Sequence, residues 1–186
     1  MLAVADADVA GPVEQALARK RRGSNRRRKA VRKVAALHGK VRRSRLDHAH
    51  KIALALVRDH DVIGHEALNV ANMTRRPAPR PAGDGTYEPN RAAAKAGLNR
   101  SILDAGWGVF LNILRAKAES AGRVVVEVNP SHTSQRCAQC GHVAAGNRVS
   151  QAMFRCLACG NEAHADVNAA INILRAGLAL QGAEAA

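Results

Sequence analysis

The chain has 186 residues, of which 47% are hydrophobic, and carries 29 Lys and Arg against 15 Asp and Glu, a net charge of +14. This length suffices for one ordinary domain with a small appendage. The charge favours a polyanionic partner, most simply a nucleic acid, although translation-related and membrane-surface proteins can share this balance. With one Trp, one Tyr and two Phe, few aromatic rings can stack on bases, so binding would rest on charge.

The chain contains no run of the roughly 20 apolar residues that a transmembrane helix needs, and its first residues lack the pattern of a signal peptide. We therefore expect a cytoplasmic protein without a membrane partner. In a reducing compartment, four cysteines arranged as two pairs favour metal binding over disulfides. The sequence does not specify an oligomeric state.

A basic helical region is expected over residues 19–60, after a weakly patterned segment, 1–18, for which no element is predicted. From Arg19 to Arg45 there are 14 Lys or Arg and no acid. Apolar residues recur at helical spacing and predict a long helix or helical hairpin from about Arg26 to Arg58. A merely solvated helix face is the alternative, but the length and single sign of the run favour phosphate binding. The residues expected to contact nucleic acid are Arg19, Lys20, Arg21, Arg22, Arg26, Arg27, Arg28, Lys29, Arg32 and Lys33.

The middle of the chain has the pattern of an α/β core. Residues 62–65 read as a buried strand that ends at Glu66, and residues 74–97, rich in Pro and Gly, read as a linker or loop. A helix is expected from about 99 to 120, followed by a strand at 123–128. The last helix is expected to pack on this core through an apolar stripe made of Val167, Ala170, Ile171, Leu174 and Leu178.

Two Cys-x-x-Cys-Gly motifs, separated by 15 residues, are the strongest signal in the chain. Two residues between cysteines allow one turn to aim both sulfurs at one ion, and the following Gly allows the turn to close. The motifs predict a structural Zn²⁺ held by Cys137, Cys140, Cys156 and Cys159, with no position left for catalytic water. His132, His142 and His164 are alternative ligands, but four thiolates already fill a tetrahedral shell.

Two carboxylates are candidates for chemistry. Asp166 can be read as a helix cap, since its carboxylate could accept amide hydrogen bonds. It can also be read as a Mg²⁺ ligand that pairs with Glu66, because oxygen ligands of this kind suit a metal site that cleaves phosphodiesters. The local pattern leaves both readings open.

Several motifs together resemble the TnpB/OrfB transposase family of insertion sequences. They lie, in order, at residues 23–29, 65–73, 104–110, 133–137 and 166–173, and include His-Glu-Ala-Leu-Asn-Val, Asp-Ala-Gly-Trp-Gly and Asp-Val-Asn-Ala-Ala. The resemblance implies an RNA-guided DNA nuclease, with guide RNA and DNA as partners. It also implies a RuvC-like catalytic domain of RNase H-like fold, interrupted by a zinc ribbon. By matching motif, Glu66 corresponds to the second catalytic acid and Asp166 to the third.

The resemblance also predicts domain limits and a defect. A partial RuvC-like core is expected over 61–130 and 161–180, the ribbon over 131–160 and a tail over 181–186. The family's first catalytic Asp has no counterpart, because Asp6 and Asp8 lack its strand setting. We therefore expect an N-terminally truncated nuclease that does not cleave by itself. The alternatives are a non-catalytic nucleic-acid binder such as a repressor, or an unrelated ribosomal or transcription-associated ribbon protein.

Overall fold

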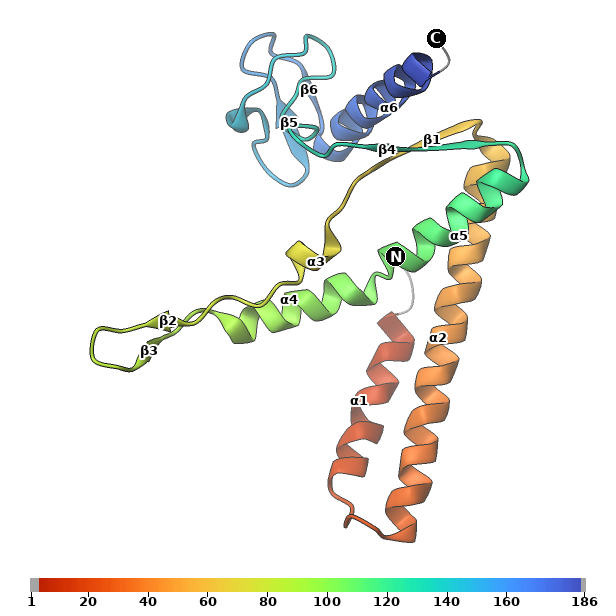
Figure 1. Ribbon diagram of the computed structural model, residues 1–186, viewed down its shortest axis with the longest axis vertical. Coiled ribbons are helices and arrows are strands. Elements are labelled where there is room, and N and C mark those ends of the chain that lie inside the picture. Colours follow the sequence, from red (N-terminus) through yellow and green to blue (C-terminus); the bar gives the residue numbers. More distant parts are fainter. Residues whose placement is uncertain (1–3, 185–186) are drawn as a thin grey trace. The chain divides into compact units, whose positions relative to one another are not determined.

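The computed structural model describes the backbone of residues 4–184 and the side chains of residues 11–183. The chain divides into two compact units, Met1–Ala53 and Leu54–Ala186, and each is described by itself. Figure 1 shows the order of the elements along the chain.

The first unit is a helical hairpin formed by α1 (Val4–Ala18) and the first part of α2 (Asn25–Asp59). Half-buried residues of α2 follow one another at steps of three or four, as a packed helix face requires: Ala30, Val34, Leu37 and Val41. Ser24 caps α2, since its Oγ accepts the Arg27 amide at 3.2 Å. The long helix expected from about Arg26 to Arg58 is therefore confirmed.

Helix α1 was not expected from the sequence. Its Ala-rich composition favours a helix, but its apolar pattern is too weak to predict one. Packing against α2 adds stability that the local sequence does not reveal. His38 Nε2 on α2 lies 2.9 Å from Glu14 Oε1 on α1, which ties the two helices together. Asp6 and Asp8 fall within α1, but their side chains lie outside those that the structure describes.

The second unit is built on a parallel pair of strands, β1 (Val62–Glu66) and β4 (Val124–Val128). Their register aligns Glu66 with Val128, so both strands end at the same edge. β1 was expected to be buried, whereas all five of its residues are half-buried. The reason is that the sheet has only these two strands within the described chain, which leaves an edge of β1 without a neighbour.

One helix lies against each face of this strand pair. α6 (Ala165–Glu184) covers the face of Gly64 and Val126: a Cβ added to Gly64 would meet Ile173, and one added to Gly177 would meet Val126. α5 (Trp107–Ser120) lies beside β4, and its Arg115 binds Glu127 on the other face. The α/β core expected from the sequence is present.

The packed face of α6 is not the predicted one. Its buried positions are Ala165, Asn168, Asn172 and Gly177. The residues expected to pack are instead exposed: Val167, Ala170, Ile171, Leu174 and Leu178. Small and amide side chains let α6 approach the strands and bond to the neighbouring loop, so the most apolar stripe is not the one that packs. α6 also continues through Gly182 to Glu184, into the segment that was taken for a tail.

The region between the two core strands has more structure than a loop. It contains α3 (Val70–Met73), a short hairpin of β2 (Arg80–Pro81) and β3 (Tyr87–Glu88), and α4 (Ala92–Asp104). The single helix expected over 99–120 is divided, because Gly106 adopts a left-handed φ of 65° between α4 and α5.

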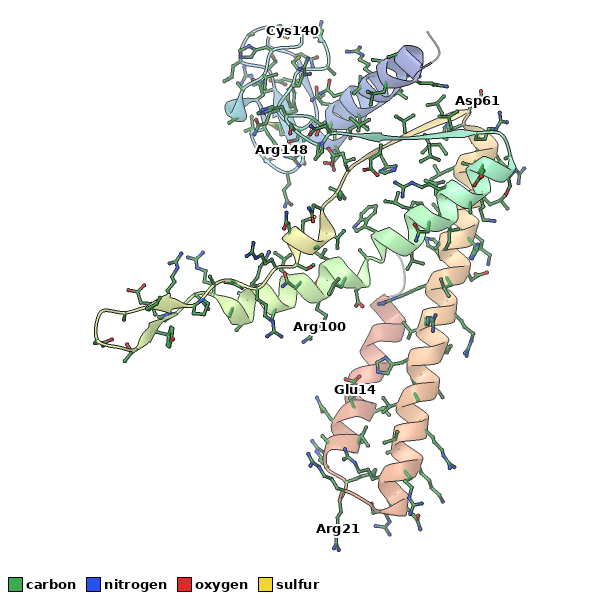
Figure 2. The ribbon with its side chains drawn as sticks, in the orientation of Figure 1. Glu14, Arg21, Asp61, Arg100, Cys140 and Arg148 are labelled. Atoms are coloured by element: carbon green, nitrogen blue, oxygen red, sulfur yellow. The ribbon has the colours of Figure 1, made fainter. Side chains whose placement is uncertain are left out.

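The cysteine region is a small antiparallel ribbon between β4 and α6. It contains β5 (Met153–Arg155) and β6 (Glu162–His164), with a short 3-10 turn, η1 (Ala145–Asn147), before them. Its buried cluster holds Phe154, Cys137, Cys156 and Ala165. Figure 2 shows Cys140 and Arg148 on this ribbon.

Within the described residues, no helix is both long and apolar enough to cross a membrane.

Alanine substitutions of two glycines should have opposite effects on the free energy of unfolding. Gly177→Ala should raise the free energy of unfolding by about 0.5 to 1 kcal/mol, because alanine favours helix and its Cβ would lie at ordinary contact, 3.6 Å from Val126. Gly122→Ala should lower it by about 1 kcal/mol, because a left-handed backbone disfavours a side chain; its φ is 64°. Urea unfolding followed by circular dichroism would measure both. Equal effects of the two substitutions would contradict this packing of α6.

Candidate functional site

The two cysteine motifs fold into matching turns. In the first, Cys137 N donates to His142 O and Gly141 N donates to Cys137 O, both at 2.9 Å. In the second, Cys156 N donates to Asn161 O at 2.9 Å and Gly160 N to Cys156 O at 3.0 Å. The glycines have φ of 78° and 73°, in the left-handed region, which explains why each motif ends in Gly.

The four cysteine sulfurs lie within 4.8 Å of one another. Cys137 Sγ is 3.7 Å from Cys159 Sγ, and Cys140 Sγ is 3.5 Å from Cys156 Sγ. Tetrahedral zinc with Zn–S bonds of about 2.3 Å places its sulfurs roughly 3.8 Å apart, so the spacing fits. The four cysteines could therefore hold a metal ion such as zinc.

The surroundings of the sulfurs favour the thiolate form at Cys156 but not at Cys159. A hydrogen bond from the Cys159 backbone lowers the pKa of Cys156 to about 6, against the opposing effect of burial. The Asn161 backbone lowers the pKa of Cys159, but hydrogen bonds with the neighbouring cysteines and burial outweigh it and raise this pKa to about 12. Among the described residues the cluster contains cysteines alone, so His132, His142 and His164 are not part of it.

Three buried asparagines connect the ribbon to itself and to α6. Asn147 donates to His142 O at 3.2 Å and accepts from Leu157 N at 2.9 Å, which joins the two cysteine turns. On α6, Asn168 accepts from Ala138 N at 2.9 Å and donates to Arg136 O at 2.7 Å. The ribbon is thus attached to the first turns of α6.

A further chain of hydrogen bonds leads from α6 to Glu66. Asn172 Nδ2 donates to Thr133 O at 3.0 Å, and Thr133 Oγ1 donates to Glu66 Oε1 at 2.5 Å. Thr133 is buried at 8% exposure and lies just before the first cysteine turn. The position of the Glu66 carboxylate therefore depends on the segment that leads into the ribbon.

Asp166 lies in the first turn of α6, at the same end of the core. It is seven residues before Ile173, so both project from similar sides of the helix. Ile173 packs over Gly64, and Glu66 lies two residues further along β1, on the same face as Gly64. Both acids therefore lie on the side of the strand pair that α6 covers, near the C-terminal ends of the strands.

The Asp166 carboxylate is the more open of the two. Its side chain is 75% exposed, and its nearest cation is Arg148 Nη2 on the ribbon, at 3.6 Å from Oδ1. Figure 2 shows Arg148 on the ribbon. An exposed pair at this distance contributes little to stability, so the carboxylate can exchange this partner for another cation.

The opposite face of β1 carries a second polar cluster behind Glu66. Arg115 Nη2 donates to Glu127 Oε2 at 2.6 Å and lies 3.2 Å from His65 Nε2. His65 Nδ1 is 3.0 Å from the Glu66 carbonyl oxygen. These contacts stabilise the C-terminal end of β1 on the face opposite to α6.

The ten basic residues named from the sequence surround the turn between α1 and α2, and eight of them are exposed. The exceptions, Lys20 and Arg27, are half-buried. Arg27 Nη1 donates to Leu17 O at 3.1 Å and to Lys20 O at 3.2 Å, so it closes the end of α1. Arg27 thus has a structural role that its position in a basic run did not reveal.

Sequence reasoning missed the residues that link the acids to the ribbon: Thr133, Arg148, Asn168 and Asn172. A signal was available for the asparagines, because residues 168 and 172 stand four apart and so share one face of a helix. For Thr133 and Arg148 no local pattern predicts a partner that is distant in sequence.

Comparison with known proteins adds two family models and several relatives. A model described as a probable transposase matches residues 13–76, and one described as a Cas12f1-like TNB domain matches residues 107–173. The putative RNA-guided DNA endonuclease InsQ of Escherichia coli K12 is 44% identical over 168 residues, which are 90% of this chain and 41% of that protein. A putative RNA-guided DNA endonuclease of Streptomyces pristinaespiralis is 33% identical over 88% of this chain and 36% of its own length. The chain thus spans about two fifths of these relatives.

Solved structures agree at the level of fold. Cas12f1 in a complex with sgRNA and target DNA has a TM-score of 0.51 at 20% identity, covering 90% of this chain and 42% of that one. CasPhi-2 (Cas12j) bound to crRNA has a TM-score of 0.52 at 25% identity, and the match covers 89% of this chain and 26% of that one. The expected fold class, an α/β RuvC-like core with an inserted cysteine ribbon, is confirmed.

Removal of one asparagine should loosen the ribbon from α6. Asn168→Ala leaves Ala138 N without its partner and removes one of the two donors to Arg136 O, which keeps Asn172 Nδ2 at 2.7 Å. An unpaired buried group costs about 1 to 3 kcal/mol. We expect the free energy of unfolding to fall by about 2 kcal/mol or more, measured by urea unfolding of the metal-loaded chain. The matched control is Val167→Ala, on the neighbouring exposed position, which should change it by no more than about 0.5 kcal/mol. Similar losses in the two variants would show that these hydrogen bonds do not hold the ribbon.

Proposed function

We propose that this chain, which belongs to the TnpB/OrfB transposase family, binds DNA and guide RNA through the basic turn between α1 and α2. The proposal includes a metal site at the end of the sheet, with Glu66 and Asp166 as carboxylate ligands for Mg²⁺, and a structural Zn²⁺ in the ribbon. The relatives described as putative RNA-guided DNA endonucleases support this assignment by analogy.

The observation that carries the proposal is a concentration of cations without counter-ions. Eight exposed Lys and Arg surround one turn, and none forms an ion pair with another described residue. A hollow of about 360 Å³ beside the turn is lined by Arg28 and Arg32. Such a cluster repels itself strongly, and phosphates relieve that repulsion while bound counter-ions are released.

The metal site is supported by the chemistry of its two acids. Carboxylate oxygens, water and substrate phosphates are what Mg²⁺ prefers. Glu66 is oriented by Thr133, and Asp166 is open to solvent beside a cation that it can exchange. The metal would stabilise the charge that develops on the phosphodiester during attack by water. Four thiolates leave zinc no open position, so its role would be structural.

We further propose that this chain alone cleaves DNA poorly or not at all. Two carboxylates hold a pair of metal ions less firmly than the three acids that the family resemblance implies. A non-catalytic role as a nucleic-acid binder is the second candidate, and the eight exposed cations at the turn favour it, because they could bind phosphates without any metal at the two acids.

Salt dependence of binding tests the proposal. A labelled 20-nucleotide RNA and the same DNA sequence would be titrated with the zinc-loaded chain at several salt concentrations. Arg28→Gln and Arg32→Gln should each weaken binding to both and lower the slope of log K against log salt by about 0.7, the value for one phosphate contact on a single strand. The control is Lys51→Gln on the same helix, whose ammonium already pairs with Asp47 at 2.6 Å. Binding that is insensitive to salt would contradict the proposed function.

Metal binding and cleavage are measured separately. Mn²⁺ binding followed by electron paramagnetic resonance should weaken in Glu66→Gln and in Asp166→Asn, with Glu162→Gln as the control because Glu162 pairs with Arg155 on the ribbon. DNA should stay intact with the wild-type chain and Mg²⁺ or Mn²⁺. Cleavage that both site substitutions abolish would overturn the proposed deficiency, while unaltered Mn²⁺ binding would remove the two acids from the site.

A further inference from the structure

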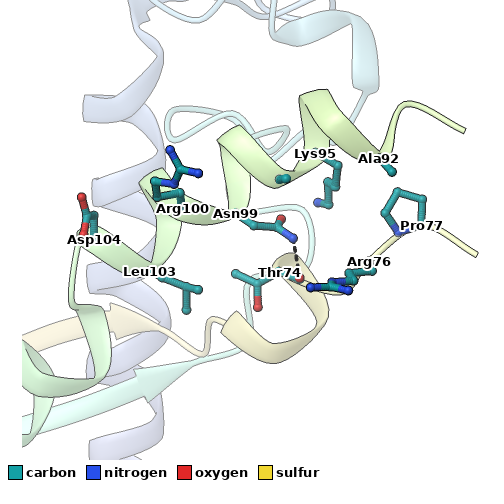
Figure 3. A pocket seen from close by; sticks show the side chains of 10 residues that line it. Thr74, Arg76, Pro77, Ala92, Lys95, Asn99, Arg100, Leu103 and Asp104 are labelled. Atoms are coloured by element: carbon teal, nitrogen blue, oxygen red, sulfur yellow. Dashed lines mark hydrogen bonds between the residues drawn. The ribbon is translucent and has the colours of Figure 1, made fainter. Parts of the chain in front are cut away.

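A second basic hollow lies in the larger unit, between the end of α3 and one face of α4. It has a volume of about 630 Å³, within the range of roughly 300 to 1,000 Å³ that small-ligand sites occupy. Figure 3 shows Lys95, Asn99 and Leu103 on α4 facing Thr74 and Arg76 across it. None of these residues belongs to the basic turn or to the carboxylate site.

Hydrogen bonds between distant residues fix the walls of this hollow. Asn99 Nδ2 donates to Thr74 O at 2.5 Å, and Lys95 Nζ donates to Met73 O at 2.6 Å. Further out, Asn90 Nδ2 donates to Ala78 O at 3.0 Å. These contacts fix the two walls of the hollow relative to each other.

The charged groups of the hollow are available to an anion. Arg76 and Arg100 have no hydrogen-bond or ion-pair partner among the described residues, and Lys95 uses one of its three donors. The acid in the lining, Asp104, already has an interaction partner. Phosphate oxygens are the acceptors that guanidinium groups bind most favourably.

Asn99, in the wall of the hollow, also carries an acceptor that lacks a donor. Asn99 Oδ1 is the one buried side-chain nitrogen or oxygen in the described structure without a hydrogen-bond partner. An unpaired buried group of this kind calls for an explanation, such as a group that the bound state supplies. A fully ionised phosphate carries no donor, whereas a nucleotide has donors on its sugar or base. Pro77, Ala96 and Leu103 add apolar wall for those parts.

We propose that this hollow binds one nucleotide of a single-stranded nucleic acid, with its phosphate at Arg76, Lys95 and Arg100 and a sugar or base donor at Asn99 Oδ1. The inference rests on the proposed function, since it assigns a second contact for the same class of partner. Single strands are favoured because their sugars and bases can enter a hollow, whereas those of a duplex are paired and stacked.

The test uses the full zinc-loaded chain and a labelled 20-nucleotide single strand, as RNA and as DNA. The double variant Arg76→Gln/Arg100→Gln should bind about tenfold more weakly or worse, because it loses two charge-assisted contacts. Its salt slope should fall by up to about 0.7, the value for one phosphate contact on a single strand. Arg76→Lys/Arg100→Lys keeps both charges and should recover most of the binding.

The matched control is Lys51→Gln/Arg155→Gln, which removes two cations that already pair with Asp47 and Glu162. It should keep the affinity within about twofold and the slope nearly unchanged. If the pocket variant matches this control while the wild-type chain binds in a salt-dependent way, the hollow is not a binding site and the proposed function stands. If the wild-type chain shows no such binding, both proposals fall.

Discussion

The gathering of four cysteine sulfurs within 4.8 Å is the interaction on which this end of the molecule depends. The ribbon has one fully buried aromatic side chain, Phe154, and short strands of three residues, so its own packing is small. In segments of this size a bound metal takes the place of a core. Hydrogen bonds of Asn168 and Thr133 connect the ribbon to α6 and to Glu66. The positions of the carboxylates therefore depend on the arrangement of the four sulfurs.

In the proposed function, different residues supply the attraction for phosphate and the candidate chemistry. Exposed cations at the turn between α1 and α2 supply attraction that falls with salt, and they carry no information about sequence. The acids at the sheet edge are few and individually oriented, since Glu66 is held by one hydroxyl and Asp166 faces one cation. A net charge of +14 therefore accounts for the proposed binding but not for the proposed chemistry, which would depend on the geometry of the sheet edge.

The sequence predicts those features that arise from local pattern. Cysteine spacing predicts the metal cluster, the apolar run before Glu66 predicts β1, and helical spacing predicts α2. The prediction failed for α6, where apolar periodicity selects Val167 and Leu178, yet the helix packs through Asn172 and Gly177. A face is buried by fit to its neighbour and by hydrogen bonds across the contact, and neither is visible in one segment. The same limit hid the Thr133 bond to Glu66, which joins residues 67 positions apart. The roles of the two acids stay predictions.

Amide hydrogen exchange of the zinc-loaded chain, compared with a Cys140→Ser variant, tests the dependence of the site on the sulfurs most directly. Loss of the metal should remove protection in the ribbon and in residues 165–172 of α6, and lower it at the Ala67 amide, which donates to Val128 O at 2.9 Å beside Glu66. Protection in the middle of α2 should be unchanged. If α6 and the end of β1 keep their protection while the ribbon alone exchanges, the sulfur cluster does not organise the carboxylates.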